Sequence, residues 1–364
     1  MDDWKPIALL PNADMRFALE GDFAAIVPPS DARIEKLRTD HPKFAELLGK
    51  FRSQFGQQVW PAVLLLKADA PDSYRTAEAI TAFRDILAAA VVPFARSIRL
   101  TTDQPSPLLF SIPFQLYPWM LDNQYEHMML TNPAELHVHL VEEFQGQTFP
   151  EQSHVSIQDH NVDKPLVGEL LDRWKVRYSG VQVEWKDKAL FRSLNMANEA
   201  AGIHALTAAT FYDVGRSLAL WVSAYEILAH PGGNGQSSYG TVSGLLEKVT
   251  WLNNNLSQAI HVVPGNPPQQ KQLASWICKK VYNLRNDFLH GNDVAGDALL
   301  LNQKIIIDFA PCLFRLALTG LLDLKFSEDA PSTADAEATG KYIAKRMRFN
   351  QYQRSFENAL LTAI

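Results

Sequence analysis

The chain has 364 residues, of which 47% are hydrophobic and 20% are charged, proportions typical of an ordinary globular protein. Its formal net charge of -6 at pH 7 argues against a protein that coats nucleic acid non-specifically, but is compatible with a locally basic RNA site. No apolar run approaches the roughly 18 residues of a membrane span, and the N-terminal residues do not resemble a signal peptide, so we expect a cytoplasmic protein without membrane contact. Cys278 and Cys312 lie in apolar helical patterns, which favours buried thiols over a disulfide or a zinc site.

The first half of the chain mixes helix and strand patterns. Residues 30–55 carry helically spaced apolar positions, and Pro42 is expected to divide them into two helices. Residues 59–68 form a short apolar run typical of a buried strand. Residues 73–92 again repeat apolar positions at helical spacing, and we expect this helix to end at Pro93.

A histidine pair marks the strand that we expect at residues 135–144. Its alternation of apolar residues with His137 and His139 places both imidazoles on one face. His154 and His160 lie nearby in the sequence, so a metal site is conceivable. However, catalytic zinc needs a third ligand and usually a second shell of residues, which the sequence does not supply unambiguously. Outward-facing polar histidines are the favoured interpretation.

The second half of the chain is predicted to be a helical bundle, because successive segments carry apolar stripes that can face one another. These predicted helices lie near residues 190–201, 211–230, 245–252, 273–290 and 299–322. Pro311 is expected to kink the last helix, whose apolar character would also suit a dimer interface.

We therefore predict an α+β protein. Its expected parts are a mixed α/β domain of unassigned role over residues 1–180, a helical bundle over 187–326, an acidic linker over 327–338 and a basic helix over 339–364. In the basic segment, cations lie next to aromatic residues and could grip phosphates while the rings stack on bases. Docking of this helix on the acidic body is the favoured alternative.

The stretch 273–293 has the strongest helix pattern. Its residues Ile277, Val281, Leu284 and Phe288 form one narrow apolar stripe. Two prolines lie just before the run and a glycine follows His290, as expected for the start and the end of a helix.

Two polar residues of this helix, Arg285 and His290, are candidates for chemistry. Residues five apart on a straight helix point about 140° away from each other, so either the last turn unwinds or a second copy of the helix completes the site. The pattern alone favours a structural interpretation, in which Arg285 pairs with a carboxylate and His290 binds the last carbonyls of the helix.

A resemblance to a known family changes this weighting. Arg285, Asn286 and His290 match the R-x4-6-H motif of the HEPN superfamily, in which a polar residue often follows the arginine. The upstream helix resembles the second helix of the Apea-like HEPN branch, and Glu226 is the residue that matches the glutamate found there. The resemblance covers roughly residues 187–326 and does not explain the first half of the chain.

The resemblance implies a metal-independent endoribonuclease that needs no cofactor. RNA carries its own nucleophile, the 2'-hydroxyl, and cleavage then leaves 2',3'-cyclic phosphate ends. His290 would move protons, Arg285 would contact the scissile phosphate, Asn286 would position it, and two protomers would bring their motifs together. Glu226 completes the implied catalytic set and would orient Arg285, whereas the residue pattern by itself favours a solvated carboxylate at the rim of its helix. The motif helix also carries the candidate RNA-binding residues Lys279, Lys280 and Asp287.

The resemblance further suggests a role in prokaryotic defence against phage or in a toxin-like system, with an antitoxin or activating ligand that no residue identifies. The alternative function is a non-catalytic RNA-binding or regulatory HEPN module, because a fold does not establish an activity. A metal enzyme in the first half, using His137 and His139, is the weakest hypothesis.

Overall fold

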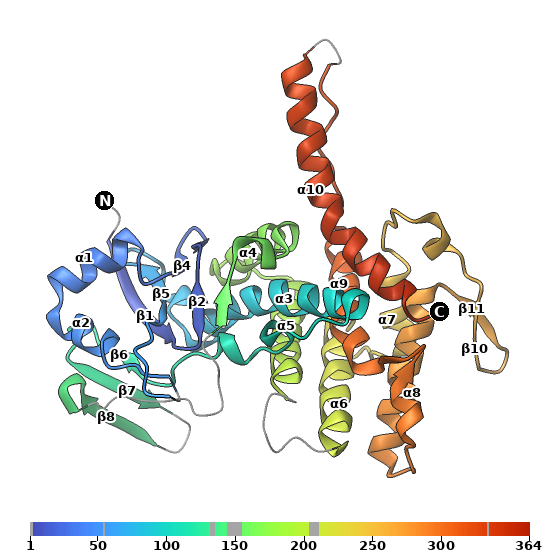
Figure 1. The fold of residues 1–364 in the computed structure, drawn as a ribbon, viewed down its shortest axis with the longest axis horizontal. Helices are drawn as coiled ribbons and strands as arrows, with labels where there is room; N and C mark the ends of the chain where they lie inside the picture. Colours follow the sequence, from blue (N-terminus) through green and yellow to red (C-terminus); the bar gives the residue numbers. More distant parts are fainter. Residues whose placement is uncertain (1–2, 54, 132–134, 144–154, 204–210, 333–334) are drawn as a thin grey trace.

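The computed structural model describes residues 3–53, 55–131, 135–143, 155–203, 211–332 and 335–364. The protein is 55% helix and 14% strand, which confirms the predicted α+β class. The larger sheets occupy one end of an elongated body, helices and two short hairpins form the rest, and one long helix projects from it (Figure 1). None of the helices in the described ranges is both long enough and apolar enough to cross a membrane.

The main sheet has four antiparallel strands in the order β1-β5-β4-β3. Its strands are β1 (Trp4–Leu10), β3 (Leu19–Glu20), β4 (Ala24–Val27) and β5 (Ala62–Lys67). The smaller sheets are β2 (Ala13–Met15) paired with β9 (Val155–Ile157), and β6 (Met120–Leu121), β7 (His127–Thr131) and β8 (Leu136–Leu140) side by side.

Strand β5 confirms the buried strand predicted from its apolar run, because both of its faces are covered. Val63 and Leu65 pack in a core with α1 (Ala32–Asp40) and α2 (Pro42–Leu48), the two helices that Pro42 separates as predicted. Leu64 and Leu66 face the opposite core, which continues into the helical part of the chain. A strand buried on both faces needs apolar residues at consecutive positions.

The prediction that a helix ends at Pro93 is wrong, because α3 continues from Ala77 to Thr102 with the proline inside it. Proline removes one helical hydrogen bond and crowds the preceding turn, which typically costs about 3 kcal/mol or more. Nearby, the Ala90 carbonyl also accepts a hydrogen bond from the Asp163 N–H at 3.0 Å. Because α3 is buried against other helices along most of its length, tertiary packing offsets the cost of the proline.

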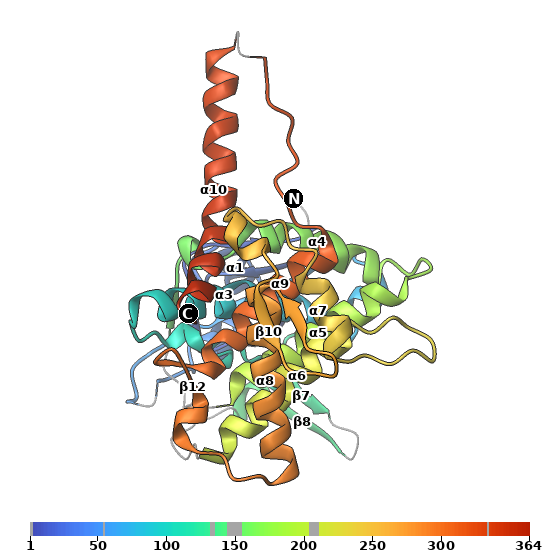
Figure 2. The ribbon, with the colours of Figure 1, turned by 90° about the vertical axis from the view of Figure 1, so that its right-hand side faces the viewer.

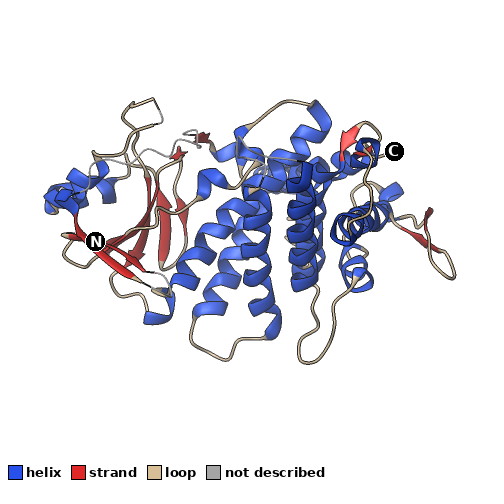
Figure 3. Ribbon diagram, turned by 90° about the horizontal axis from the view of Figure 1, so that it is seen from below, coloured by secondary structure: helices blue, strands red, loops and turns tan. Residues whose placement is uncertain are grey.

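Helices make up most of the body (Figure 3). Four of the remaining helices contact α3 directly, and the other three pack against those four and against one another. The remaining helices are α4 (Lys164–Tyr178), α5 (Trp185–Gly202), α6 (Phe211–Leu228), α7 (Tyr239–Leu246), α8 (Leu273–His290), α9 (Phe309–Leu322) and α10 (Ala336–Leu361). One hydrophobic core runs from one face of the main sheet through α3 into these helices, so the two halves of the chain share it. A short hairpin of β10 (His261–Val263) and β11 (Gln269–Lys271) precedes α8.

A buried ion pair ties three of these helices together. The Nε of Arg315 in α9 donates to the Asp163 carboxylate at the start of α4 at 2.8 Å, and both side chains are almost fully buried. The Nη1 of Arg315 donates to Gln353 of α10 at 2.9 Å. Because a buried charge without its partner is strongly destabilising, this pair fixes how α4, α9 and α10 meet.

The predicted helix over residues 299–322 is also wrong in its first part. A two-residue turn at Asn302 and Gln303, with φ of +46° and +67°, joins β12 (Leu300–Leu301) to β13 (Lys304–Ile305). Such left-handed backbone at both turn positions defines the tight turn that connects two antiparallel strands. Helix α9 begins only at Phe309, so Pro311 lies in its first turn and does not kink it.

The expected dimer surface on this last helix is not available. All residues from Phe309 to Gly320 are buried within the chain, and α3, α6, α7 and α10 pack around α9. At Gly320 an added Cβ would lie 2.0 Å from the Leu245 carbonyl oxygen of α7, which shows how closely the two backbones approach. The apolar character of α9 therefore reflects its central position.

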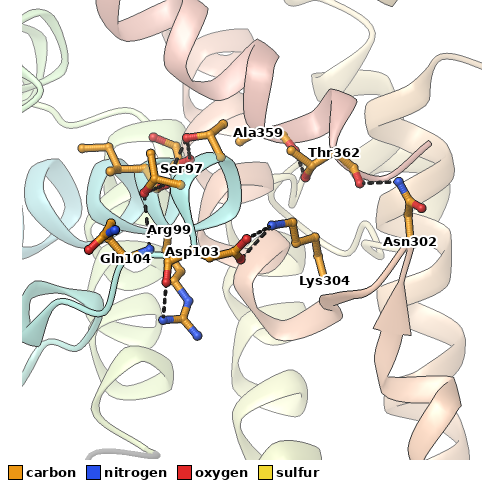
Figure 4. Close-up of polar contacts among 11 residues, drawn as sticks. Ser97, Arg99, Asp103, Gln104, Asn302, Lys304, Ala359 and Thr362 are labelled. Carbon is orange, nitrogen blue, oxygen red and sulfur yellow. Dashed lines mark hydrogen bonds and ion pairs between the residues drawn. The ribbon is translucent and has the colours of Figure 1, made fainter.

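The β12–β13 hairpin anchors the ends of α3 and α10 (Figure 4). The Lys304 ammonium contacts both carboxylate oxygens of Asp103, which follows α3, at 2.7 Å. The Asn302 amide donates to the carbonyl oxygens of Thr362 at 3.0 Å and Ile364 at 2.9 Å. The turn thus supplies partners for carbonyls that follow the last turn of α10.

Candidate functional site

Helix α8 has the bounds and the buried stripe that its sequence predicts. Ile277 and Val281 are fully buried, Leu284 is nearly so, and Phe288 packs against the same core from a half-buried position. Gly291 follows the helix with φ of +71°, a conformation that glycine adopts without strain.

The last turn of α8 does not unwind. The Gly291 N–H donates to the Phe288 carbonyl at 3.3 Å, and the Asn292 N–H donates to the Asp287 carbonyl at 2.9 Å, so the helix closes regularly after His290. The angle of about 140° between positions 285 and 290 therefore persists. Within one chain, Arg285 and His290 do not aim at the same atom.

Arg285 is half-buried, and not every N–H group of its guanidinium has a hydrogen-bond partner. Its Nη1 donates to the Oδ1 of Asn286 at 3.0 Å, whereas its Nε is buried without a hydrogen-bond partner. It forms no ion pair with any carboxylate of the described residues. The carboxylate partner that the structural interpretation requires is thus not found in the described part of the chain.

Tyr282 lies one turn before Arg285 and was not singled out by the sequence. The residue is 6% exposed, and its hydroxyl lies beside the Glu226 carboxylate without a hydrogen bond of regular geometry. Burial raises the pKa of Tyr282 most, the nearby Glu226 carboxylate raises it further, and the Arg285 cation opposes the rise. Tyr282 therefore lies near both Glu226 of α6 and Arg285 of α8, and the three form one polar cluster.

His290 is exposed at the free end of α8, the end that points away from the body (Figure 1). No hydrogen bond or ion pair joins it to another residue of the described ranges, so it does not bind the last carbonyls of its helix. Two exposed apolar residues lie at the same end of the α6–α8 pair, Leu289 with 54% and Tyr212 with 77% of its surface exposed.

The three candidate RNA-binding residues have different surroundings. Lys279 lies beside the polar cluster, because its Nζ is 5.1 Å from the ring centroid of Tyr239, whose ring meets Tyr282 edge-on at 5.7 Å. Lys280 instead lies over the Trp276 ring, on another side of the helix.

Asp287, the third candidate, accepts a hydrogen bond from the Asn292 amide at 2.9 Å. This contact stabilises the end of the helix and occupies one of its carboxylate oxygens. Of the three residues, only Lys279 joins the cluster around Tyr282.

The histidines of β8 share one face of the strand, as predicted, next to the Trp119 ring. His137 contacts Glu135 at 2.6 Å and His139 contacts Glu143 at 3.3 Å. No group of three potential metal ligands comes together among the residues that the structure describes, and His154 lies outside them. Both cysteines are buried, as predicted, and burial raises the pKa of each thiol.

The basic C-terminal helix begins at Ala336, three residues before its predicted start. Its aromatic residues are already occupied, because Tyr342 and Phe349 contact the Phe326 ring, whereas Tyr352 and Phe356 are buried. The rings are therefore not free to stack on bases. Only the C-terminal part of α10 docks on the body.

Comparisons of the chain with protein-family models, with curated proteins and with solved structures give no match.

Proposed function

We propose that the protein is a metal-independent endoribonuclease of the HEPN type, with its active site at the C-terminal half of α8. The observation that carries the proposal is Arg285, a half-buried cation whose Nε has no hydrogen-bond partner and which pairs with no described carboxylate. An unsatisfied buried donor is costly, and a phosphate oxygen is the kind of acceptor that a guanidinium binds best.

The polar cluster around Arg285 has donors and cations that can bind a phosphodiester group of RNA. The hydroxyl of Tyr282, which makes no hydrogen bond of regular geometry, lies one turn away beside Glu226, and Lys279 adds a further cation. In the proposed reaction the RNA 2'-oxygen attacks the adjacent phosphorus, the P–O5' bond breaks, and a 2',3'-cyclic phosphate forms. Arg285 stabilises the developing negative charge.

His290 is the proposed proton-transfer group. An imidazole can act as a base or as an acid, so His290 can take the proton of the 2'-hydroxyl or give one to the leaving 5'-oxygen. Its freedom from contacts with described residues leaves both ring nitrogens available.

We further propose that two protomers form the site together. Arg285 and His290 diverge by about 140° on a regular helix, so an isologous pair of α8 helices would place Arg285 of one chain opposite His290 of the other. The exposed Leu289 and Tyr212 at the same end supply apolar surface for this contact.

The resemblance to HEPN proteins supports a role in antiviral defence or in a toxin-like system that acts on cytoplasmic RNA. Expression of the wild-type chain should then arrest bacterial growth, and His290→Ala should relieve the arrest. Equal toxicity of the two chains would contradict this role.

The decisive experiment is cleavage of labelled tRNA, mRNA and single-stranded oligonucleotides in EDTA. We expect wild-type products with cyclic phosphate ends, and Arg285→Ala and His290→Ala should each lower the rate by about 10²-fold or more without loss of fold. Arg192→Ala and His160→Ala are matched controls, because both residues are exposed and lie on other elements. Undiminished cleavage by the two motif variants would refute the proposal, and equal RNA binding without cleavage by wild type would favour a non-catalytic module.

A further inference from the structure

The N-terminal part of α10 forms an arm, defined here as residues 336–354, which projects from the body (Figures 1 and 2). The helix is anchored from Tyr352 onward, where Tyr352 and Gln353 are buried and Phe356 and Leu360 fully so. At 1.5 Å per residue the arm is about 27 Å long. An isolated helix of this length is marginal in water, so its surroundings must stabilise it.

One face of the arm is covered by the extended chain that precedes it. The Phe326 ring lies 5.5 Å from the Tyr342 ring and 5.7 Å from the Phe349 ring, measured between centroids. The Lys345 ammonium contacts Glu328 at 3.1 Å on the same side. This extended chain covers only the inner face of the arm.

The outer face of the arm is a continuous exposed seam. Its members are spaced by three or four residues and lie within about 80° of arc on the helix. They are Ala336, Gly340, Ile343, Met347, Gln351 and Arg354, all of them exposed. At its centre Ile343 has 49% and Met347 63% of its surface exposed. Such spacing is typical of a helix that packs against another helix.

Charge is distributed unequally along this arm. The tip of the arm, residues 335–340, contains two acidic and no basic residues, whereas Glu328 lies lower, beside Lys345. The part nearer the body carries Arg346, Arg348 and Arg354, none of which forms an ion pair with a described residue. Two exposed acid–base pairs, Lys341–Glu337 and Lys345–Glu328, lie between these ends.

A groove of about 600 Å³ lies where the arm meets α3. Its walls include Phe94 and the 38% exposed Ile98 of α3, and Met347, Arg348 and Arg354 of α10. The basic end of the seam therefore opens into a partly apolar groove that is large enough for the end of a helix.

We propose that the occupant of this seam is the arm of a second copy of the chain, packed antiparallel about a two-fold axis near residue 345. This arrangement places Ile343 opposite the partner's Met347, and the small Ala336 and Gly340 opposite the partner's Arg354 and Gln351. The acidic tip of each arm reaches the basic groove of the other. A parallel arrangement would bring like charges together, which disfavours it.

The arm contact is independent of the proposed ribonuclease site, because the arm and the free end of α8 project from opposite sides of the body (Figure 1). The arm contact and the proposed α8 contact are both isologous, so together they would link active dimers into larger assemblies. Either contact can be lost while the other remains.

Cysteine cross-linking tests the register. In an oxidised equimolar mixture, Ile343→Cys chains should cross-link to Met347→Cys chains, and each variant alone should give little covalent dimer. Lys345→Cys is the matched control, because this position lies at the same height on the opposite face. Cross-links within the single variants would indicate a parallel pair, and no cross-links in the mixture would overturn the proposal.

Solution mass tests the contact itself. Sedimentation of the full chain should show self-association. Ile343→Lys and Arg354→Glu should each lower the mass of the particle in solution about twofold. Glu337→Arg combined with Arg354→Glu should restore the wild-type mass. Circular dichroism should show unchanged helix content in each variant. A wild-type chain that stays monomeric at tens of micromolar, or variants of unchanged mass, would refute the arm contact.

Discussion

Gly215 of α6 lies directly under the ring of Phe288 in α8. A Cβ at position 215 would be 2.7 Å from two ring atoms of Phe288, which is closer than real carbon contacts allow. Phe288 stands between Arg285 and His290 in the sequence, so this close approach of two helices holds the segment on which the candidate site depends.

Gly215→Ala should therefore move the last turn of α8. We expect a loss of about 1–3 kcal/mol in the free energy of unfolding, as for other overpacked cores, and a fall in RNA cleavage. Urea denaturation and the cleavage assay measure the two effects. Gly168→Ala is the control, because an added Cβ there meets nothing within 4 Å and should leave cleavage unchanged. Unaltered stability and cleavage in Gly215→Ala would contradict the rigid contact.

Mixing inactive chains tests whether the site is shared between protomers. Arg285→Ala and His290→Ala chains, each inactive alone, should recover about a quarter of the wild-type activity when mixed in equal amounts. Half of the dimers are then mixed, and one of the two sites in each is intact. A site within a single chain would give no recovery, so the cleavage rate of the mixture decides between the two arrangements.

Tyr282→Phe should separate stability from RNA contact. The hydroxyl of Tyr282 is buried beside Glu226 without a hydrogen bond of regular geometry, so its removal should leave the free energy of unfolding unchanged or raise it by up to about 1–3 kcal/mol. RNA affinity should fall if this hydroxyl donates to a phosphate. Tyr239→Phe is the comparison for stability, because it removes a hydrogen bond to the Ser275 carbonyl at 3.1 Å and should destabilise. Strong destabilisation by Tyr282→Phe would reveal a structural role.

The buried carboxyl of Asp85, in the first half of the chain, should make the free energy of unfolding depend on pH. Burial, opposed by the Arg84 cation, raises the pKa of Asp85 from 3.8 to about 6. A carboxyl with a raised pKa in the folded state stabilises most below its unfolded pKa, and this contribution is lost as pH rises through the folded pKa.

The measurement is the free energy of unfolding of wild type minus that of Asp85→Asn, as a function of pH. Between pH 4 and 6 this difference should fall by an amount on the order of 2–3 kcal/mol, because Asp85→Asn cannot ionise. Asp31 is the control, because its carboxyl is bonded to Arg33 and has a lowered pKa. The corresponding difference for Asp31→Asn should rise with pH. A difference that rises with pH would show that ion pairing with Arg84 outweighs burial.

Local patterns predicted several elements correctly, because their causes lie within a few residues of chain. Pro42 separates α1 from α2, and the glycine after His290 ends α8, since each residue restricts or permits a backbone conformation wherever it occurs. The consecutive apolar residues of β5 indicated a strand covered on both faces.

The errors arose where distant contacts override local preference. Pro93 stays inside α3 because neighbouring helices bury it, and α9 is apolar because it lies at the centre of the fold, not because it meets a partner. The left-handed turn at Asn302 was overlooked because the apolar residues on both sides also fit a helical pattern.

For the candidate site, the sequence by itself determined the helix, its buried stripe and the divergence of Arg285 from His290, because helical periodicity sets all three. Only the tertiary structure decided that Tyr282 lies near both Glu226 and Arg285 and that the Nε of Arg285 lacks a partner. Those properties depend on how α6 packs against α8, and the stripe of one helix does not specify which polar groups its neighbour places beside it.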